Sequence, residues 1–62
     1  MNDYELLKQM QYEAKQIELF ASGLLTEMDE REVDEMTMKI VKHAVNLNDV
    51  AWARIRLRGG TK

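Results

Sequence analysis

The 62-residue chain has 32% charged residues, a formal net charge of -2, and neither cysteine nor proline. The lack of cysteine excludes a disulfide framework and a thiolate metal site, and no stretch approaches the roughly 20 apolar residues that cross a bilayer. A chain of this length forms one domain at most. Because a domain of about 60 residues buries only about 60% of the surface that it exposes when unfolded, we expect the chain to gain stability as a homodimer.

Apolar or small residues recur every three or four positions in the first part of the chain, which is typical of a coiled-coil stripe. This first stripe contains Leu7, Met10, Ala14, Ile17, Ala21, Leu24 and Met28. Asn2 or Asp3 can cap the start, because a short side-chain oxygen accepts hydrogen bonds from the unpaired amides of a first helical turn. The pattern predicts a helix over about residues 3–22.

Two signals compete for the position of the chain reversal. Gly23 can end the first helix in a left-handed conformation, after which Thr26 and Asp29 would form a capping box for a second helix. Alternatively, the first stripe continues through Gly23, and the turn lies at Asp29–Glu30. We place the turn at residues 23–26 and start the second helix at about residue 27.

A second stripe follows the turn. It contains Val33, Met36 or Thr37, Ile40, His43 or Ala44, Leu47, and Val50 or Ala51. It predicts a helix over about residues 27–57, ended by Gly59 and followed by a frayed tail at 59–62. A break at Asn46–Asp49 would instead give a small three-helix bundle.

The two stripes predict an all-α fold, in which an antiparallel helical hairpin dimerises into a four-helix bundle. Small side chains in the stripes should let the two helices of the hairpin approach closely. These small residues are Ala14, Ala21, Ala44 and Ala51.

The second helix has more apolar surface than one neighbouring helix can cover. At 100° per residue, a further apolar set lies about a quarter-turn from the second stripe. It consists of Met38, Val41, Val45, Trp52 and Ile55. A twin subunit would cover this set in a four-helix bundle, or Trp52 would anchor a different protein, since tryptophan is enriched among interface hot spots. We assign the set as a partner or dimer interface.

The sequence contains no recognisable catalytic, cofactor-binding or metal-binding set of residues. Ser22 is the only serine, and His43, the only histidine, lies several helical turns away, so a nucleophile and a base do not meet. The acidic run of residues 27–35 lacks the Asp-x-Asp-x-Asp-Gly spacing of a calcium loop. We therefore predict that the chain is not an enzyme and binds no metal or cofactor. His43 is interpreted as a packed edge residue, with a pH-sensitive interface as the alternative.

Charge is divided unevenly along the chain. Residues 1–38 hold three basic and ten acidic side chains, whereas residues 39–62 hold six basic and one acidic. In an antiparallel hairpin the acidic run lies at the turn, and Arg54, Arg56 and Arg58 lie at the open end. A head-to-tail or antiparallel partner chain would bring these opposite charges together.

One outward stripe of the first helix combines aromatic and basic side chains. It contains Tyr4, Lys8, Tyr12 and Lys15. Such groups can stack on RNA bases and neutralise phosphates. Glu5, Glu13 and Glu18 on the same helix oppose that use, because affinity for phosphates depends on net neutralisation of their charge. We predict these four residues of the first helix as a candidate nucleic-acid face, and we expect no contact with a membrane.

The second part of the chain resembles the Rop family of plasmid copy-number proteins, which dimerise into a four-helix bundle and bind paired RNA loops. The likeness is densest from Asp29 to Ile55, under half of the chain. The matching positions are Asp29, Glu32, His43-Ala44, Leu47 and Ala53-Arg54, and Met36, Ile40 and Ile55 are similar in kind. The resemblance supports the architecture. The RNA-binding groups of Rop lie on its first helix and include an exposed phenylalanine, and since the matching position here is Glu13, RNA binding is not carried over.

These patterns together predict a small non-enzymatic regulatory or adaptor protein that acts by protein–protein interaction. We expect it in the cytoplasm and of the kind that phages or plasmids encode. A Rop-like RNA-binding regulator is the alternative.

Overall fold

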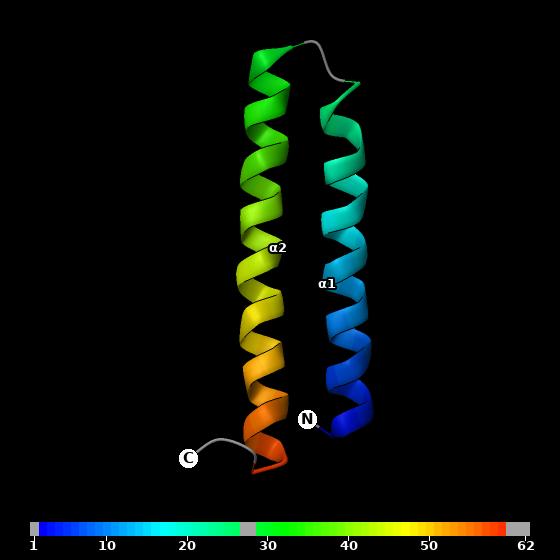
Figure 1. Cartoon of the computed structure of the whole chain (residues 1–62), viewed down its shortest axis with the longest axis vertical. Coiled ribbons are helices and arrows are strands. Elements are labelled where there is room, and N and C mark those ends of the chain that lie inside the picture. The colour runs from blue at the N-terminus through cyan, green and yellow to red at the C-terminus, as the bar shows by residue number, and fades with distance from the viewer. Residues whose placement is uncertain (1, 27–28, 60–62) are drawn as a thin grey trace.

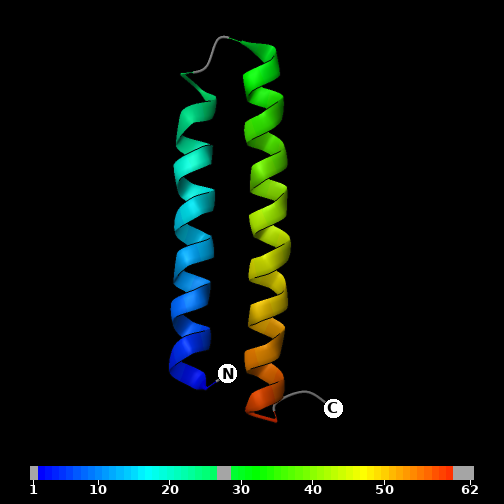
Figure 2. The same cartoon turned by 180° about the vertical axis from the view of Figure 1, so that it is seen from behind.

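The computed structural model describes residues 2–26 and 29–59, which form two long helices packed side by side. Helix α1 spans Asp3–Leu24 and helix α2 spans Glu30–Leu57; they run antiparallel, so the N-terminus lies beside the end of α2 (Figures 1 and 2). The Cα atoms extend over 45 × 21 × 14 Å, a rod only one helix thick. The predicted all-α helical hairpin is confirmed. Neither helix of this described part combines the length and the apolar character that a membrane crossing requires.

Local sequence sets both helix starts. The Asn2 side chain accepts from the backbone N–H of Glu5 at 2.8 Å, and the Glu5 carboxylate accepts from the backbone N–H of Asn2 at 3.2 Å. This reciprocal pair is a capping box, and it satisfies two amides at the start of α1. At the start of α2, the Asp29 carboxylate accepts from the backbone N–H of Arg31 at 2.9 Å.

Glycine ends α2 as predicted. Gly59 has a φ of 66°, in the left-handed region that glycine adopts without steric cost. Its backbone N–H donates to the carbonyl of Arg56 at 3.0 Å, and the N–H of Arg58 donates to the carbonyl of Arg54 at 3.1 Å. These bonds satisfy carbonyls of the last turn, so the helix ends there.

The turn differs from the predicted one. Gly23 does not end the first helix in a left-handed conformation; it lies inside α1, and among residues 2–26 and 29–59 only Gly59 has a positive φ. Thr26 does not cap α2, because its N–H and hydroxyl both donate back to the carbonyl of Gly23, at 3.3 and 3.1 Å. Asp29 is the N-cap instead. α1 therefore continues to Leu24 and α2 begins at Glu30, not at residue 27.

α2 passes through Asn46–Asp49 without a break, so the three-helix alternative is wrong. Asn48 and Asp49 are exposed on the solvent side of the continuous helix. Three predictions lie outside the described residues: Met28 in the first stripe, Glu27 in the acidic run, and the tail beyond Gly59.

The core is a narrow seam between the helices. On α2 the predicted stripe faces α1, with Met36 and His43 occupying the positions at which Thr37 and Ala44 were alternatives. The half-buried residues of this stripe are Val33, Met36, Ile40, His43, Leu47, Val50 and Ala51. The choice of face on α2 is therefore confirmed.

On α1 the predicted stripe is partly wrong. Met10, Ile17 and Leu24 are half-buried as expected, but Leu7, Ala14 and Ala21 are exposed. The neighbouring row of Leu6, Glu13 and Phe20 faces α2 instead, so α1 is rotated by about 50° from the predicted orientation. Packing this row hides two large apolar side chains, whereas the predicted row contains two alanines. Of the four alanines expected to let the helices approach closely, only Ala51 is half-buried in this seam, and Ala14, Ala21 and Ala44 are exposed.

Candidate functional site

A polar cluster crosses the middle of the seam. His43 Nδ1 lies 2.5 Å from Glu13 Oε1, and Gln9 Nε2 donates to Glu13 Oε2 at 2.9 Å. The Phe20 ring stacks on the His43 ring with centroids 5.9 Å apart, and the Tyr12 ring meets His43 edge-on at 6.4 Å. Glu13 is only 4% exposed, yet both of its oxygens have partners, as a buried carboxylate requires.

Sequence reasoning missed this cluster because Glu13 interrupts the apolar spacing of its row. The available signal was a carboxylate and the lone histidine at the same height in two antiparallel helices. The structure places His43 in the seam as a packed residue, joined to Glu13 across 30 positions of sequence.

The hydrogen bond from His43 is the main cause that lowers the pKa of Glu13 below its ordinary value of 4.5. Burial acts against it, and hydrogen bonds from Gln9 and Asn46 and the charge of His43 lower the pKa further. A carboxyl with a lowered folded-state pKa stabilises the fold above the pKa of the unfolded chain, and loses that contribution as pH falls through the folded value. The cluster therefore stabilises the hairpin near neutral pH and weakens under acid conditions.

The Ser22 hydroxyl donates to the carbonyl of Leu19 at 2.9 Å, within its own helix. No group of three His, Cys, Asp or Glu side chains suited to a metal ion occurs in residues 2–26 and 29–59.

The predicted partner interface lies on the outside of α2. We call it the outer face; it consists of Met38, Val41, Val45, Trp52 and Ile55, each between 37% and 69% exposed. Within it, Met38, Val45 and Trp52 are spaced by seven and lie opposite α1, because each is about 180° around the helix from the seam. Val41 and Ile55 are turned toward one broad side of the hairpin.

That broad side carries small side chains from both helices. On each helix, the residues that directly follow some of the seam residues form a second row. The side chains of this row point about 80° away from the centre of the seam. Because both helices are right-handed and run in opposite directions, equal turns bring the two rows to the same broad side. We call it the alanine side; it consists of Leu7, Ala14 and Ala21 of α1 and Thr37, Ala44 and Ala51 of α2.

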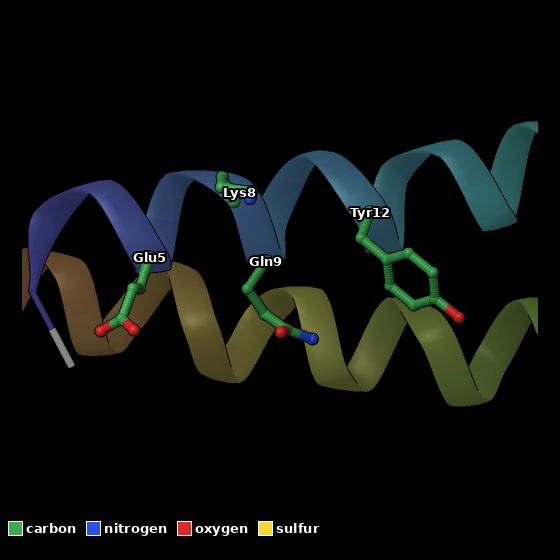
Figure 3. Close-up of a pocket in the computed structure, with 4 residues that line it drawn as sticks. All are labelled: Glu5, Lys8, Gln9 and Tyr12. Carbon is green, nitrogen blue, oxygen red and sulfur yellow. The ribbon is translucent and has the colours of Figure 1, made fainter.

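The opposite broad side, which we call the polar side, is lined by amide, charged and aromatic groups. Gln9 and Tyr12 extend from α1 over α2 there (Figure 3). Lys39 Nζ lies 5.3 Å from the Phe20 ring centroid and reaches across from α2 on this side. The two broad sides of the hairpin therefore differ strongly in character.

The candidate nucleic-acid residues, Tyr4, Lys8, Tyr12 and Lys15, are all exposed on α1. Lys8 Nζ lies 5.4 Å from the Tyr4 ring centroid, so these two side chains are brought together. Tyr12 is turned toward the polar side, where it shares an open hollow with Glu5, Lys8 and Gln9 (Figure 3). Lys8 therefore connects Tyr4 with the hollow at Tyr12, and the Glu5 carboxylate lies beside this basic group.

Charge is separated between the two ends of the hairpin. At the open end, Arg54 Nε donates to Asp3 Oδ1 at 2.8 Å, which joins the end of α2 to the start of α1. Arg56 and Arg58 lie at the same end and are exposed. At the turn end, the first turns of α2 expose Glu30, Glu32, Asp34 and Glu35.

No known protein family, characterised protein or solved structure matches this chain.

Proposed function

We propose that this chain is a small non-enzymatic regulatory or adaptor protein that binds another protein through the outer face of α2. The observation that carries the proposal is the exposure of the five large apolar side chains that make up this face. Contiguous exposed apolar surface is uncommon on a monomeric protein and marks interaction sites. The proposal includes a cytoplasmic location and an origin in a phage or plasmid, as the sequence predicts.

Trp52 is the expected anchor of the partner. Trp52 is 44% exposed near the C-terminal end of the outer face, and tryptophan is enriched among residues that dominate binding energy. Met38 and Val45 lie on the same row and extend the contact along the helix. An α-helix of a partner that lays its own apolar stripe along this row would match this geometry.

Substitution of Trp52 tests the proposal. Trp52→Ala should weaken partner binding by about 30-fold or more, the loss typical of a hot spot. Helicity should be retained, because alanine favours helices and the ring is half-exposed. The tagged chain would be used to capture a partner from its host cells, and the purified pair would then be titrated by calorimetry.

The matched control is Leu19→Ala, which removes an exposed apolar side chain from α1 on the polar side. This variant should bind the partner as the original chain does. If Trp52→Ala and Leu19→Ala captured the same proteins with equal affinity, the outer face would not be the binding site.

Binding of structured RNA is the second candidate function, and the Rop resemblance is one reason for it. The contact between Lys8 and Tyr4 favours it, because a cation beside an exposed ring can engage a base and a phosphate together. Glu5 beside Lys8 acts against it. A gel-shift titration with structured RNA at two salt concentrations decides the matter: absence of binding at low salt would remove this function.

A further inference from the structure

The outer face of α2 repeats with the period of a coiled coil. Its apolar side chains are spaced alternately by three and four residues, except at one step where Asn48 takes the expected position. We call the complete set the outer row; it consists of Met38, Val41, Val45, Asn48, Trp52 and Ile55, and all six residues are exposed. Unbroken spacing of this kind keeps one side of a helix in contact with a second helix along its length.

A row of charged side chains runs beside the outer row and is turned from it toward the polar side. It has one charge in every seven residues, and the sign alternates from each charge to the next. We call it the charged row; it consists of Glu35, Lys42, Asp49 and Arg56, and all four residues are exposed. None of them takes part in the two ion pairs found within residues 2–26 and 29–59. In a heptad, charges at this position flank the contact and select the partner helix.

We propose that the partner of the outer face is an amphipathic helix of a different protein, which runs antiparallel to α2, matches the charged row with opposite charges and places an amide side chain opposite Asn48. The proposal rests on the protein–protein role proposed above and identifies the chemistry of that partner. The contact extends from Met38 to Ile55, which is about 26 Å of helix at 1.5 Å per residue.

The charges at the ends of α2 favour the antiparallel orientation. Acidic side chains fill the first turn of α2 and arginines lie in its last turn. The same distribution is favoured in helices generally, because acidic groups stabilise the start of the helix dipole and basic groups stabilise its end. A partner helix of this common type meets opposite charges at both ends of α2 only if it runs antiparallel. In a parallel pair, the two acidic starts would lie side by side and repel each other.

The charged row fixes the register of the partner along α2. The partner has to present acidic side chains to Lys42 and Arg56, and basic side chains to Glu35 and Asp49. Because the signs alternate, a displacement of the partner by one heptad would bring like charges opposite one another along the row. Such like-charge contacts oppose the wrong register, even where the apolar contacts would allow it.

Asn48 determines what the partner presents in the middle of the contact. An amide that is buried in an apolar contact without a hydrogen bond is costly, and a single polar residue in a heptad seam selects its partner for that reason. A facing Asn or Gln can both donate to and accept from the Asn48 amide. A facing leucine or valine would leave that amide unpaired.

Asn48 also disfavours a second copy of α2 as the occupant of the outer face. Two α2 helices packed antiparallel along their outer rows would match each acid of the charged row with a base. In that register, however, Asn48 of each chain lies against Val45 of the other, so two amides are buried without partners. A different protein that supplies an amide at this level satisfies both the charges and Asn48.

A synthetic helix tests the proposal with the whole chain. The probe is a peptide of about four heptads with leucine at its contact positions, alanine opposite Trp52 and asparagine opposite Asn48. Its flanking charges, in chain order, are Glu, Lys, Glu and Lys, which face Arg56, Asp49, Lys42 and Glu35. The matched control peptide has the same composition with every Glu and Lys exchanged. In calorimetric titrations the first peptide should bind at least about tenfold more tightly than the control peptide.

Exchanging charges within the chain tests the row directly. In the double variant Lys42→Glu with Asp49→Lys, each peptide meets two matched and two mismatched charges, so the tenfold preference should disappear. The matched control is Lys15→Glu with Glu18→Lys, a double variant at exposed positions of α1. It leaves the net charge unchanged as well, and it should retain the full preference. Circular dichroism of the peptides and variants records their helicity.

A double-mutant cycle tests the amide contact. Asn48→Leu should bind the asparagine peptide about tenfold more weakly, relative to a peptide with leucine at that position, than the original chain does. A carbodiimide, which joins a lysine to a carboxylate that it contacts, identifies the occupant. With the first peptide bound, it should link Lys42 to the facing glutamate of the peptide. In the original chain alone, a link from Lys42 to Asp49 of a second chain would show that a second copy covers the outer face, and would overturn the proposal.

The proposal is also overturned if neither peptide binds, if both bind equally, or if the charge exchange at positions 42 and 49 leaves the preference unchanged. The partner role is judged separately. If Trp52→Ala abolished capture of a host protein while both peptides bound equally, that role would stand and the charge-matched antiparallel helix would be refuted. If the peptides were distinguished as expected, but Trp52→Ala and Leu19→Ala captured the same host proteins, only the partner role would be refuted.

Discussion

Alanine substitutions at two adjacent leucines, Leu6 and Leu7, test which face of α1 packs against α2. Leu6 is 3% exposed in the seam, whereas Leu7 is 45% exposed on the alanine side. Leu6→Ala removes a fully packed side chain and leaves a cavity, and we expect a loss of about 3 kcal/mol in the free energy of unfolding, within the usual range for buried leucine. Leu7→Ala removes a side chain that is only about half-covered, and it should cost about 1 kcal/mol.

The assay is urea unfolding followed by circular dichroism, at a concentration where light scattering shows single chains. The difference of about 2 kcal/mol corresponds to about 30-fold in the unfolding equilibrium, well above the error of the method. Equal costs in the single-chain regime would refute the observed rotation of α1 and restore the orientation that the apolar spacing predicts.

The remaining predictions concern single positions. Gly23→Ala should raise stability by about 0.5–1 kcal/mol, because α1 continues through this position and the new Cβ meets only the flexible Met36 thioether at 3.4 Å. Gly59→Ala should cost about 1 kcal/mol at its positive φ, and thermal unfolding compares the two glycine variants. The original chain should lose stability as pH falls below the ordinary carboxyl pKa of 4.5 and through the lower folded-state pKa of Glu13, and Glu13→Gln should flatten that dependence in urea titrations; an unchanged slope would contradict the role of Glu13. Asn2→Ala should cost about 1 kcal/mol through loss of the capping box, with Gln11→Ala, at an exposed position of the same helix, as the control that leaves the box in place.

Gly23 was predicted to end the first helix but lies inside α1, and this difference has a physical explanation. Glycine is permissive toward the left-handed conformation but does not require it, so a glycine near a helix end is only a weak stop signal. The helix continued because Leu24 remains in the seam, and Thr26 then satisfied the carbonyl of Gly23. Gly59 did end its helix, and the residues that follow it in the sequence, Gly60, Thr61 and Lys62, provide no apolar side chain that would favour another turn.

The sequence by itself determined the two helices, the antiparallel hairpin, the ending at Gly59 and the face that α2 turns to α1. Each of these depends on local chemistry or on apolar spacing within one helix. The large apolar side chains of the outer face were also evident from spacing, because α2 has more of them than one neighbour can cover.

The tertiary structure decided the rotation of α1 and, with it, the exposure of Ala14 and Ala21. Two adjacent rows of α1 have similar apolar content, and the spacing of one helix cannot distinguish them. The choice depends on what each row meets on α2: Glu13 meets His43, and Leu6 and Phe20 hide more apolar area than Leu7 and Ala21 would. Contacts between residues 30 positions apart thus selected the row, and this selection left the small side chains on an open broad side.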